Sequence, residues 1–336
     1  MAKNDSSPKV LKRLLHFVKK YYRLLLKLFL VAFLLLLFPS TNIYSTNLTS
    51  NSVESAKKPI DLPAPPLYPV NIGNIYPDYL TAEGVTIEDL HSGVILYSKN
   101  PDSQLSPAST TKIATALVAL DHYSLDDVLT VKTVEHTKNV MGLVPDEKIT
   151  FESLLYGLLV DSANDAAYTI AENYTGGVDS FVGAMNKKAQ DLHLNNTHFT
   201  NPIGFDDANH YTTASDLTKL ASVALRNKTI SKIVGTRAIT VSDVSFTYFH
   251  DLRNVNQLLG EIPGVAGVKT GYTENAAECL VTLVRRDNNE VLTVVLRSSD
   301  RFKETANLIS WVFQNYKWVD IKKLQNNNLT GTTKGQ

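Results

Sequence analysis

The chain has 336 residues, of which 43% are hydrophobic, so it has room for one large or two small domains with a substantial core. The 33 basic and 33 acidic side chains cancel to zero formal charge. This balance argues against a nucleic-acid-binding protein, which normally carries a basic excess or patch. The single cysteine, Cys279, excludes an internal disulfide and a cysteine-based zinc site, and its apolar neighbours favour a buried strand position.

The first 38 residues join a basic segment to an apolar one. Lysines and arginines crowd the region before Leu28, and the run Leu28–Phe38 is apolar throughout. This order is typical of a signal peptide or a signal anchor. Because no small-residue cleavage site follows this run, we favour an uncleaved membrane anchor at 24–38 behind a basic cytoplasmic tail at 1–23. A cleaved signal peptide is the alternative, and both predict export of the rest of the chain.

The next segment and the last one differ in composition from the region between them. Residues 39–74 are rich in Ser, Thr, Asn and Pro, which predicts an extended tether between a membrane and a folded domain. Residues 323–336 are polar and predicted to be disordered. The folded unit is therefore expected at 75–322.

Strand patterns lie at both ends of this unit and helical patterns lie between them. Two hairpins are predicted, one from 84–90 and 92–97 and the other from 278–284 and 291–296. Helical periodicity is found at 111–121, 151–160, 165–174, 178–192, 214–224 and 304–313. This order predicts an α+β fold, in which both ends of the domain form one antiparallel sheet and the middle forms a helical subdomain.

The first candidate site is Ser109-Thr-Thr-Lys112, where a predicted helix begins. A serine hydroxyl becomes a good nucleophile when a neighbouring base removes its proton, and a lysine is such a base only when it is neutral. Burial or a nearby cation lowers a lysine pKa enough for that. The alternative is that Ser109 only caps the helix and Lys112 is a solvated charge.

Two further motifs follow in the chain. Ser162-Ala-Asn164 lies in a loop between helices, and Lys269-Thr270-Gly271 precedes a strand. The Ser162 hydroxyl can relay a proton, and the Asn164 amide can hold a substrate carbonyl. A glycine on a strand, such as Gly271, lets another backbone approach closely. The alternatives are an ordinary turn and an exposed lysine beside a bulge.

Each motif is weak alone, but their order is that of class A β-lactamases and penicillin-binding proteins. With the flanking segments 156–167, 197–204 and 209–217, the chain resembles the exported D-alanyl-D-alanine carboxypeptidases, or low-molecular-weight penicillin-binding proteins, from about Tyr79 to Trp318. The resemblance implies a transpeptidase-like domain that acts outside the bacterial cell membrane. It also implies peptidoglycan stem peptides as substrates, β-lactams as covalent inhibitors, and neither a cofactor nor a metal.

The resemblance also implies a role for each motif residue. Ser109 would attack the carbonyl between two D-alanines, Lys112 would be its base, Ser162 would relay a proton and Asn164 would position the substrate. Backbone N–H groups of Ser109 and Tyr272 would form the oxyanion hole. The substrate carboxylate would be bound by the segment Lys269–Gly271 and by Arg301, for which a surface salt bridge is the alternative.

Other readings remain open. A class A β-lactamase would need a deacylating glutamate, which Asp191-Leu-His-Leu-Asn195 matches only in part. A transpeptidase or endopeptidase would share the motifs, and an inactive wall-binding protein would not require all of them. The chain departs from many relatives at Ala276-Ala277-Glu278 and at Phe205, and we expect no second β-rich domain and no C-terminal membrane helix. His210 is interpreted as structural.

Overall fold

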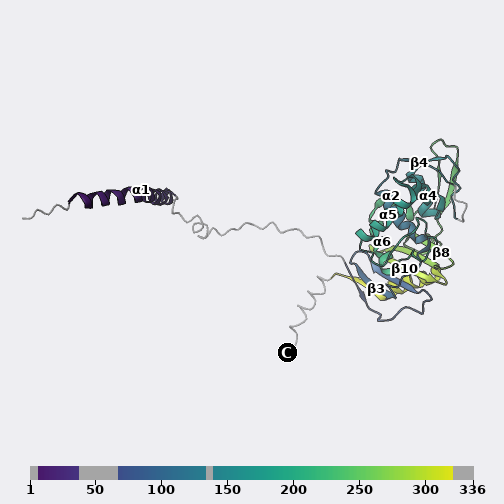
Figure 1. Cartoon of the computed structure of the whole chain (residues 1–336). Coiled ribbons are helices and arrows are strands. Elements are labelled where there is room, and N and C mark those ends of the chain that lie inside the picture. The colour runs from purple at the N-terminus through teal and green to yellow at the C-terminus, as the bar shows by residue number, and fades with distance from the viewer. Residues whose placement is uncertain (1–6, 38–66, 134–138, 321–336) are drawn as a thin grey trace, which may run out of the picture. The chain divides into compact units, whose positions relative to one another are not determined.

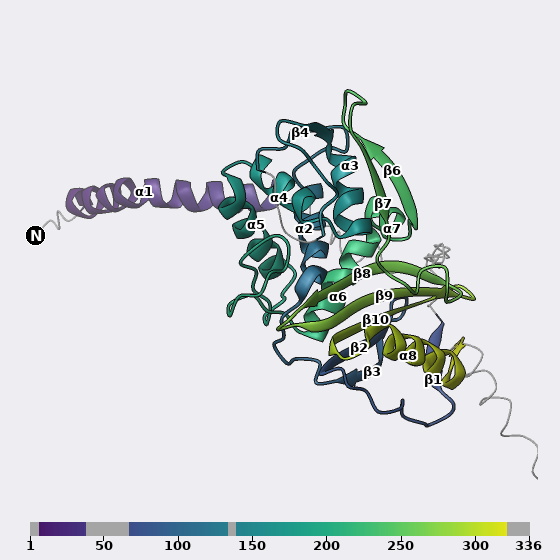
Figure 2. The same cartoon turned by 90° about the vertical axis from the view of Figure 1, so that its right-hand side faces the viewer.

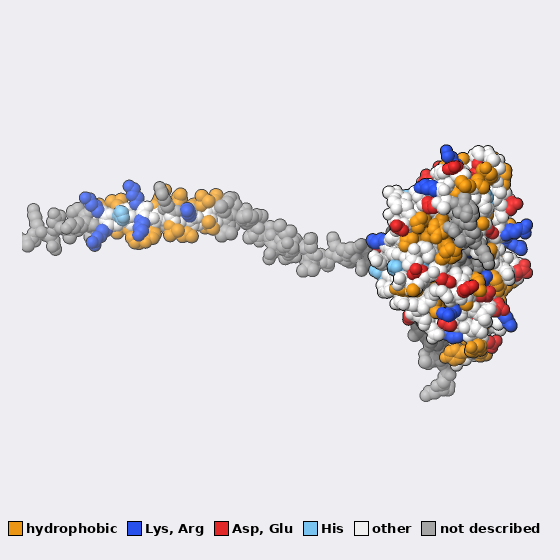
Figure 3. All heavy atoms as spheres, turned by 45° about the vertical axis from the view of Figure 1, so that its right-hand side comes forward, with side chains coloured by type: hydrophobic (Ala, Val, Ile, Leu, Met, Phe, Trp, Pro, Cys, Tyr) orange, Lys and Arg blue, Asp and Glu red, His pale blue; other side chains and the backbone are white. Residues whose placement is uncertain are grey.

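The computed structural model describes residues 7–37, 67–133 and 139–320, which belong to two compact units, 1–63 and 64–336 (Figure 1). The first unit contributes helix α1 (Ser7–Leu37), along which basic and hydrophobic side chains are interspersed (Figure 3). Among the described residues, no helix has both the length and the apolar character needed to cross a membrane. The anchor predicted at 24–38 stays a prediction. The predicted tail at 323–336 and most of the tether lie outside the described residues.

The second unit is built on a five-stranded antiparallel sheet with the strand order β3-β2-β10-β9-β8. Its strands are β2 (Gly84–Asp89), β3 (Val94–Lys99), β8 (Val265–Thr273), β9 (Ala277–Arg286) and β10 (Asn289–Ser298). The β2–β3 hairpin from the start of the domain pairs with β10 from its end, with Val85 opposite Val295. This pairing confirms that both ends of the domain form one sheet.

Helices cover both faces of the sheet (Figure 2). One face is covered by α8 (Arg301–Asn315), the last helix. The helical region on the other face contains α2 (Lys112–Leu120), α3 (Phe151–Tyr156), α4 (Asn164–Asn173), α5 (Gly177–Asp191), α6 (Ala214–Arg226) and α7 (Lys228–Val234). The central helix is α2, whose residues from Lys112 to Ala119 are all buried.

The core follows the two-residue repeat of the strands. In β10, Leu292, Val294 and Leu296 belong to the large apolar cluster that the helical region shares with the sheet. Val291 and Val295 point the other way and pack with Trp311 and its neighbours on α8. Because both faces of the central strands are apolar, the sheet is stable only between two helical layers.

Neither α7 nor β8 was predicted, and the third motif lies within β8 and does not precede a strand. The short strands of the domain were not predicted either. They form three two-stranded sheets, β1 (Tyr68–Asn71) with β11 (Tyr316–Val319), β4 (Val128–Thr130) with β5 (Lys148–Thr150), and β6 (Ala238–Ser242) with β7 (Phe249–Arg253). The first pair corrects the predicted boundary at residue 74, because residues 68–71 belong to the folded domain and not to the tether. Pairing between segments so distant in the chain leaves no local pattern in either of them.

Candidate active site

Ser109 lies in a single 3₁₀ turn, η1 (Ala108–Thr111), immediately before α2. Its Oγ lies 3.0 Å from the Nζ of Lys112, one turn further along the chain. The structure shows no side-chain cap at the start of α2, so the interpretation of Ser109 as a helix cap is wrong. Ser109 is partly exposed whereas Lys112 is fully buried, which leaves the hydroxyl open to a reactant and its partner shielded from water.

Lys112 is held by three oxygen atoms. Its Nζ is within hydrogen-bond distance of Ser109 Oγ, of Asn164 Oδ1 (2.7 Å) and of the Ile203 carbonyl (3.1 Å). Burial holds its pKa well below the ordinary value, and the nearby charge of Lys269 adds to this effect. The interpretation of Lys112 as a solvated charge is therefore wrong, and its amine has the environment of a base.

The second motif lies where one helix ends and another begins. After α3 the chain continues as a π-helix, η2 (Gly157–Asp161), and Ser162 then takes a left-handed backbone conformation with φ 63°. Asn164 begins α4. The segment is a turn, as the alternative held, but both side chains are buried and point at lysines, Asn164 at Lys112 and Ser162 at Lys269.

Lys269 lies on the edge strand β8 with only 1% of its surface exposed. Its Nζ donates to Ser162 Oγ at 2.8 Å and to the Thr270 carbonyl at 3.1 Å. Burial, together with the charge of Arg301, lowers its pKa to about 7. The alternative of an exposed lysine is wrong, and the two lysines with the Ser162–Asn164 segment form one connected polar group.

Gly271 brings strand β8 against the turn that holds Ser109. A Cβ atom at Gly271 would lie 3.0 Å from Ala108 Cβ, from the Pro107 carbonyl oxygen and from the backbone nitrogen of Ser109. The strand and the 3₁₀ turn are thus in backbone contact, as expected for a strand glycine. The next residue, Tyr272, is 61% exposed, so its ring does not fill the space between the strand and the turn.

Arg301 is the first residue of α8. Its Nη1 donates to the Gly271 carbonyl at 2.6 Å, so the guanidinium contacts the strand of the third motif and not a surface carboxylate. Its Nε is buried and has no hydrogen-bond partner within the described residues. The guanidinium is thus a cation held next to the third motif, and its fork of donors is of the kind that binds carboxylates.

Comparisons with known proteins place this geometry in a family. The family described as peptidase S11, D-alanyl-D-alanine carboxypeptidase, matches residues 74–300. The chain belongs to this family. Its fold is the transpeptidase fold, since the crystal structure of the Streptomyces K15 DD-transpeptidase matches with a TM-score of 0.68 at 34% identity, covering 71% of this chain and 100% of that one.

Relatives within the S11 family have more than one described activity. The D-alanyl-D-alanine carboxypeptidase DacF of Bacillus subtilis is 35% identical over 72% of this chain, which spans 64% of that relative's length. A D-alanyl-D-alanine endopeptidase of Pseudomonas aeruginosa is 33% identical over 68% of this chain and 74% of its own. Family membership therefore places the chain among serine-type D-Ala-D-Ala peptidases and leaves the choice between these activities open.

Two supporting residues of the site were not predicted from the sequence. Asp165 accepts hydrogen bonds from the backbone N–H groups of Met141, Gly142 and Leu143. Asn201 Oδ1 accepts from the three consecutive N–H groups of residues 203–205 and so shapes the loop whose carbonyl contacts Lys112. An Asn or Asp beside a motif is a weak signal, because most such residues form ordinary turns.

His210 has the structural role that was predicted. Its Nδ1 accepts from the Thr200 N–H at 3.0 Å, and its Nε2 lies 2.9 Å from Thr111 Oγ1. Burial lowers its pKa to about 4, so the ring is neutral near pH 7 and supports the start of α2. The strand position predicted for Cys279 is also confirmed, since this residue lies buried in β9 and burial raises its pKa to about 11.

Proposed function

We propose that the protein is a serine D-Ala-D-Ala carboxypeptidase, which removes the terminal D-alanine from peptidoglycan stem pentapeptides through an acyl-enzyme on Ser109. The observation that carries this proposal is the contact between Ser109 and the buried amine of Lys112 at 3.0 Å. A partly exposed hydroxyl next to a lysine of lowered pKa is the arrangement that nucleophilic catalysis requires. The substrate lies in the cell wall, so we also place the activity outside the cytoplasm.

In the proposed acylation, neutral Lys112 takes the hydroxyl proton of Ser109 while Oγ attacks the carbonyl carbon of the penultimate D-alanine. The carbonyl oxygen becomes an oxyanion, which the backbone N–H groups of Ser109 and Tyr272 stabilise. Such preorganised donors act strongly because they need no rearrangement during the reaction. The close approach of β8 to the Ser109 turn at Gly271 supports this assignment.

The tetrahedral intermediate then loses the terminal D-alanine. The C–N bond breaks, and the departing amine takes a proton from the Ser162 hydroxyl, which regains one from Lys112 or Lys269. The distance of 2.8 Å between Ser162 Oγ and Lys269 Nζ supports this relay. Water completes the cycle by attacking the acyl-enzyme, which releases the shortened peptide and returns the proton to Ser109.

The substrate ends in a carboxylate, and two cationic groups are available to bind it. Lys269 Nζ donates to the Thr270 carbonyl and Arg301 Nη1 donates to the Gly271 carbonyl, so both cations lie along the same strand segment. We assign the Thr270 hydroxyl to the same carboxylate subsite. Asn164 Oδ1 contacts Lys112, so this side chain lies next to the proposed base, a place from which it could position the peptide. The same recognition explains β-lactam inhibition, since these drugs carry a carboxylate next to a reactive amide.

Endopeptidase or transpeptidase activity is the second candidate, because relatives are described by those names. The class A β-lactamase reading lacks support. Asp191 is an exposed residue at the end of α5 and forms an ion pair with Lys187, which is not the setting of a deacylating acid. An inactive wall-binding protein would not need the buried lysine amines that this site maintains.

The test uses the full chain, purified in detergent, and a synthetic pentapeptide ending in D-Ala-D-Ala. We expect release of free D-alanine by the wild type and none by Ser109→Ala. Glycine in the assay detects transfer to an amine, and a cross-linked muropeptide detects endopeptidase activity. If a folded wild type cleaves only the cross-linked substrate, the carboxypeptidase assignment fails and the endopeptidase replaces it.

A further inference from the structure

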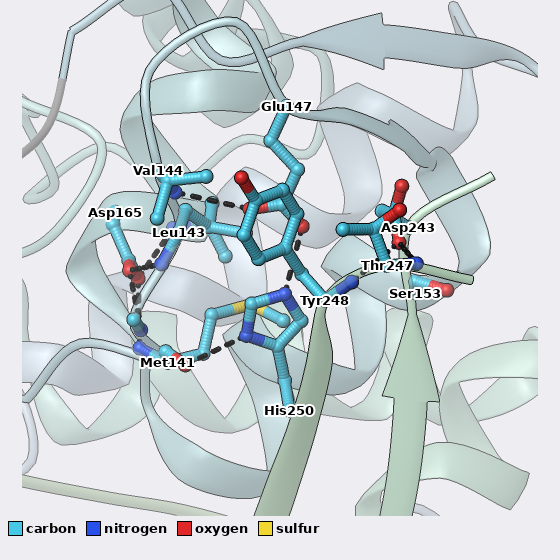
Figure 4. Close-up of polar contacts among 12 residues, drawn as sticks. Met141, Leu143, Val144, Glu147, Ser153, Asp165, Asp243, Thr247, Tyr248 and His250 are labelled. Atoms are coloured by element: carbon cyan, nitrogen blue, oxygen red, sulfur yellow. Dashed lines mark hydrogen bonds and ion pairs between the residues drawn. The ribbon is translucent and has the colours of Figure 1, made fainter. Parts of the chain in front are cut away.

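A buried histidine, His250, lies outside the three motifs but contacts the loop that supports one of them. It lies on β7 with 4% of its side chain exposed, and its partner Glu147 is fully buried (Figure 4). Neither residue has a part in the proposed reaction. The loop between them and the active site comprises residues 139–146 and is called here the support loop.

On its inner side, the support loop is bonded to the second motif. The Asp165 carboxylate accepts from three of its backbone N–H groups at 3.0–3.1 Å, and the Asn139 carbonyl accepts from the Asn164 N–H at 2.7 Å. The Met141 side chain also packs on Gly157, since a Cβ there would lie 2.3 Å from Met141 Sδ. Gly157 begins the π-helix that leads to Ser162. The loop therefore contacts the chain on both sides of Ser162, at Gly157 before it and at Asn164 and Asp165 after it.

On its outer side, the support loop is bonded to His250 and Glu147. The Nδ1 of His250 donates to the Met141 carbonyl at 3.0 Å, and Nε2 lies 2.7 Å from Glu147 Oε1. Glu147 Oε2 accepts from the Val144 N–H at 3.0 Å. A carbonyl oxygen can only accept, so Nδ1 carries a proton, and the carboxylate favours a second proton on Nε2. The hydrogen bond to Glu147 raises the pKa of His250 accordingly.

We propose that His250 is a positioning residue of the active site, which fixes the Met141 peptide and through it the placement of Ser162 and Asn164. The peptide group that joins Met141 to Gly142 is bonded on both sides, its N–H to Asp165 and its carbonyl to His250. Any shift of that peptide moves the backbone N–H groups of Met141 and Gly142, which hold Asp165 at the end of the second motif. The proposal rests on the function proposed above, since it assigns an effect on that reaction.

The test compares acylation rates of the full chain with a fluorescent penicillin, measured alongside thermal unfolding. The double variant Glu147→Leu/His250→Phe removes the network without leaving a buried charge unpaired, a replacement that proteins often tolerate. We expect its acylation rate constant to fall about 10- to 100-fold, the scale of a small misplacement of catalytic groups, while its melting temperature stays near that of the wild type. Glu147→Gln can keep hydrogen bonds to both His250 and the Val144 N–H, and we expect this variant to retain most of the wild-type rate.

The matched control is Asp243→Asn on the same hairpin. Asp243 accepts backbone hydrogen bonds from residues 245, 247 and 248 at the turn between β6 and β7, so this change weakens the hairpin without touching the support loop. We expect acylation at the wild-type rate. The proposal is overturned if the double variant acylates like the wild type, or if Asp243→Asn slows acylation as much. A wild type that does not react at all contradicts the proposed function instead.

Discussion

The two halves of the domain supply the active site in different ways. The sheet contributes Lys269 and Gly271 from the edge strand β8, whose pairing with β9 is regular from Val268 to Thr273, so side-chain alternation and hydrogen-bond register fix each position there. The helical region contributes Ser109 and Ser162 from irregular backbone, a 3₁₀ turn and the end of a π-helix. Backbone of that kind is stable only when surrounding contacts determine it, because non-glycine residues with positive φ are strained.

This difference shows where each half is sensitive to change. The sheet side depends on close backbone approach and on the burial of charge. The helical side depends on contacts from distant loops, such as the Ile203 carbonyl on Lys112 and the support loop on the second motif. Substitutions in the two halves are therefore expected to differ in how strongly they change the reaction rate and the free energy of unfolding.

The largest effect is expected at the centre of the helical half. Lys112→Met keeps the length and apolar stem of the side chain but removes the base, so acylation is expected to fall by at least about 10³-fold. A fluorescent penicillin measures the rate, and circular dichroism checks the fold. Acylation within tenfold of the wild type would show that another group accepts the Ser109 proton.

The next effect concerns Gly204, which lies in the loop that packs against the Ser109 turn. Gly204 has φ +89°, and a Cβ there would lie 1.9 Å from the Ala108 carbonyl oxygen. We expect Gly204→Ala to lower the free energy of unfolding by about 3 kcal/mol, through overpacking and backbone strain. Gly183→Ala is the control, because Gly183 lies inside α5 and a Cβ there would have no neighbouring atom within 4 Å. This change should raise the free energy of unfolding by about 0.5–1 kcal/mol. Urea unfolding measures both, and equal effects would refute this account.

On the sheet side, the corresponding test is Gly271→Ala. The new methyl group would stand 3.0 Å from the Ser109 nitrogen and from two other atoms, which forces β8 and the 3₁₀ turn apart by a small distance. We expect kcat/KM for the pentapeptide to fall about 10- to 100-fold, with less loss of stability than Gly204→Ala causes. A variant that unfolds as readily as Gly204→Ala, or that retains full activity, would remove the contrast between the halves.

The smallest effect is the pH dependence that Lys269 gives to stability. Its pKa is about 7 in the folded protein against an ordinary 10.5, so between these values the unfolded chain binds more protons. The free energy of unfolding should then rise with pH, by up to about 1.4 kcal/mol per pH unit, and this contribution is lost as pH falls through about 7. Lys269→Met should show a flatter curve in urea unfolding from pH 6 to 9. Parallel curves would mean that Lys269 is not buried as a neutral amine.

The sequence by itself determined the main architecture of the catalytic domain. Apolar runs bounded by turns predicted the two hairpins of the sheet, and helical periodicity predicted most of the helices, because these patterns are local consequences of burial. The three motifs identified the lysines and serines of the site through their order. The contacts of Lys112 with Ser109 and of Lys269 with Ser162 agree with that prediction.

Only the tertiary structure decided which groups support those residues. The pairing of β1 with β11, the hydrogen bonds from the support loop to Asp165, and the His250–Glu147 contact all join segments distant in sequence. The same holds for the lowered pKa values of both lysines, which result from burial and from a second cation nearby, Lys269 for Lys112 and Arg301 for Lys269. Local sequence encodes which faces are apolar, whereas the environment of a charge is set by all the segments that surround it.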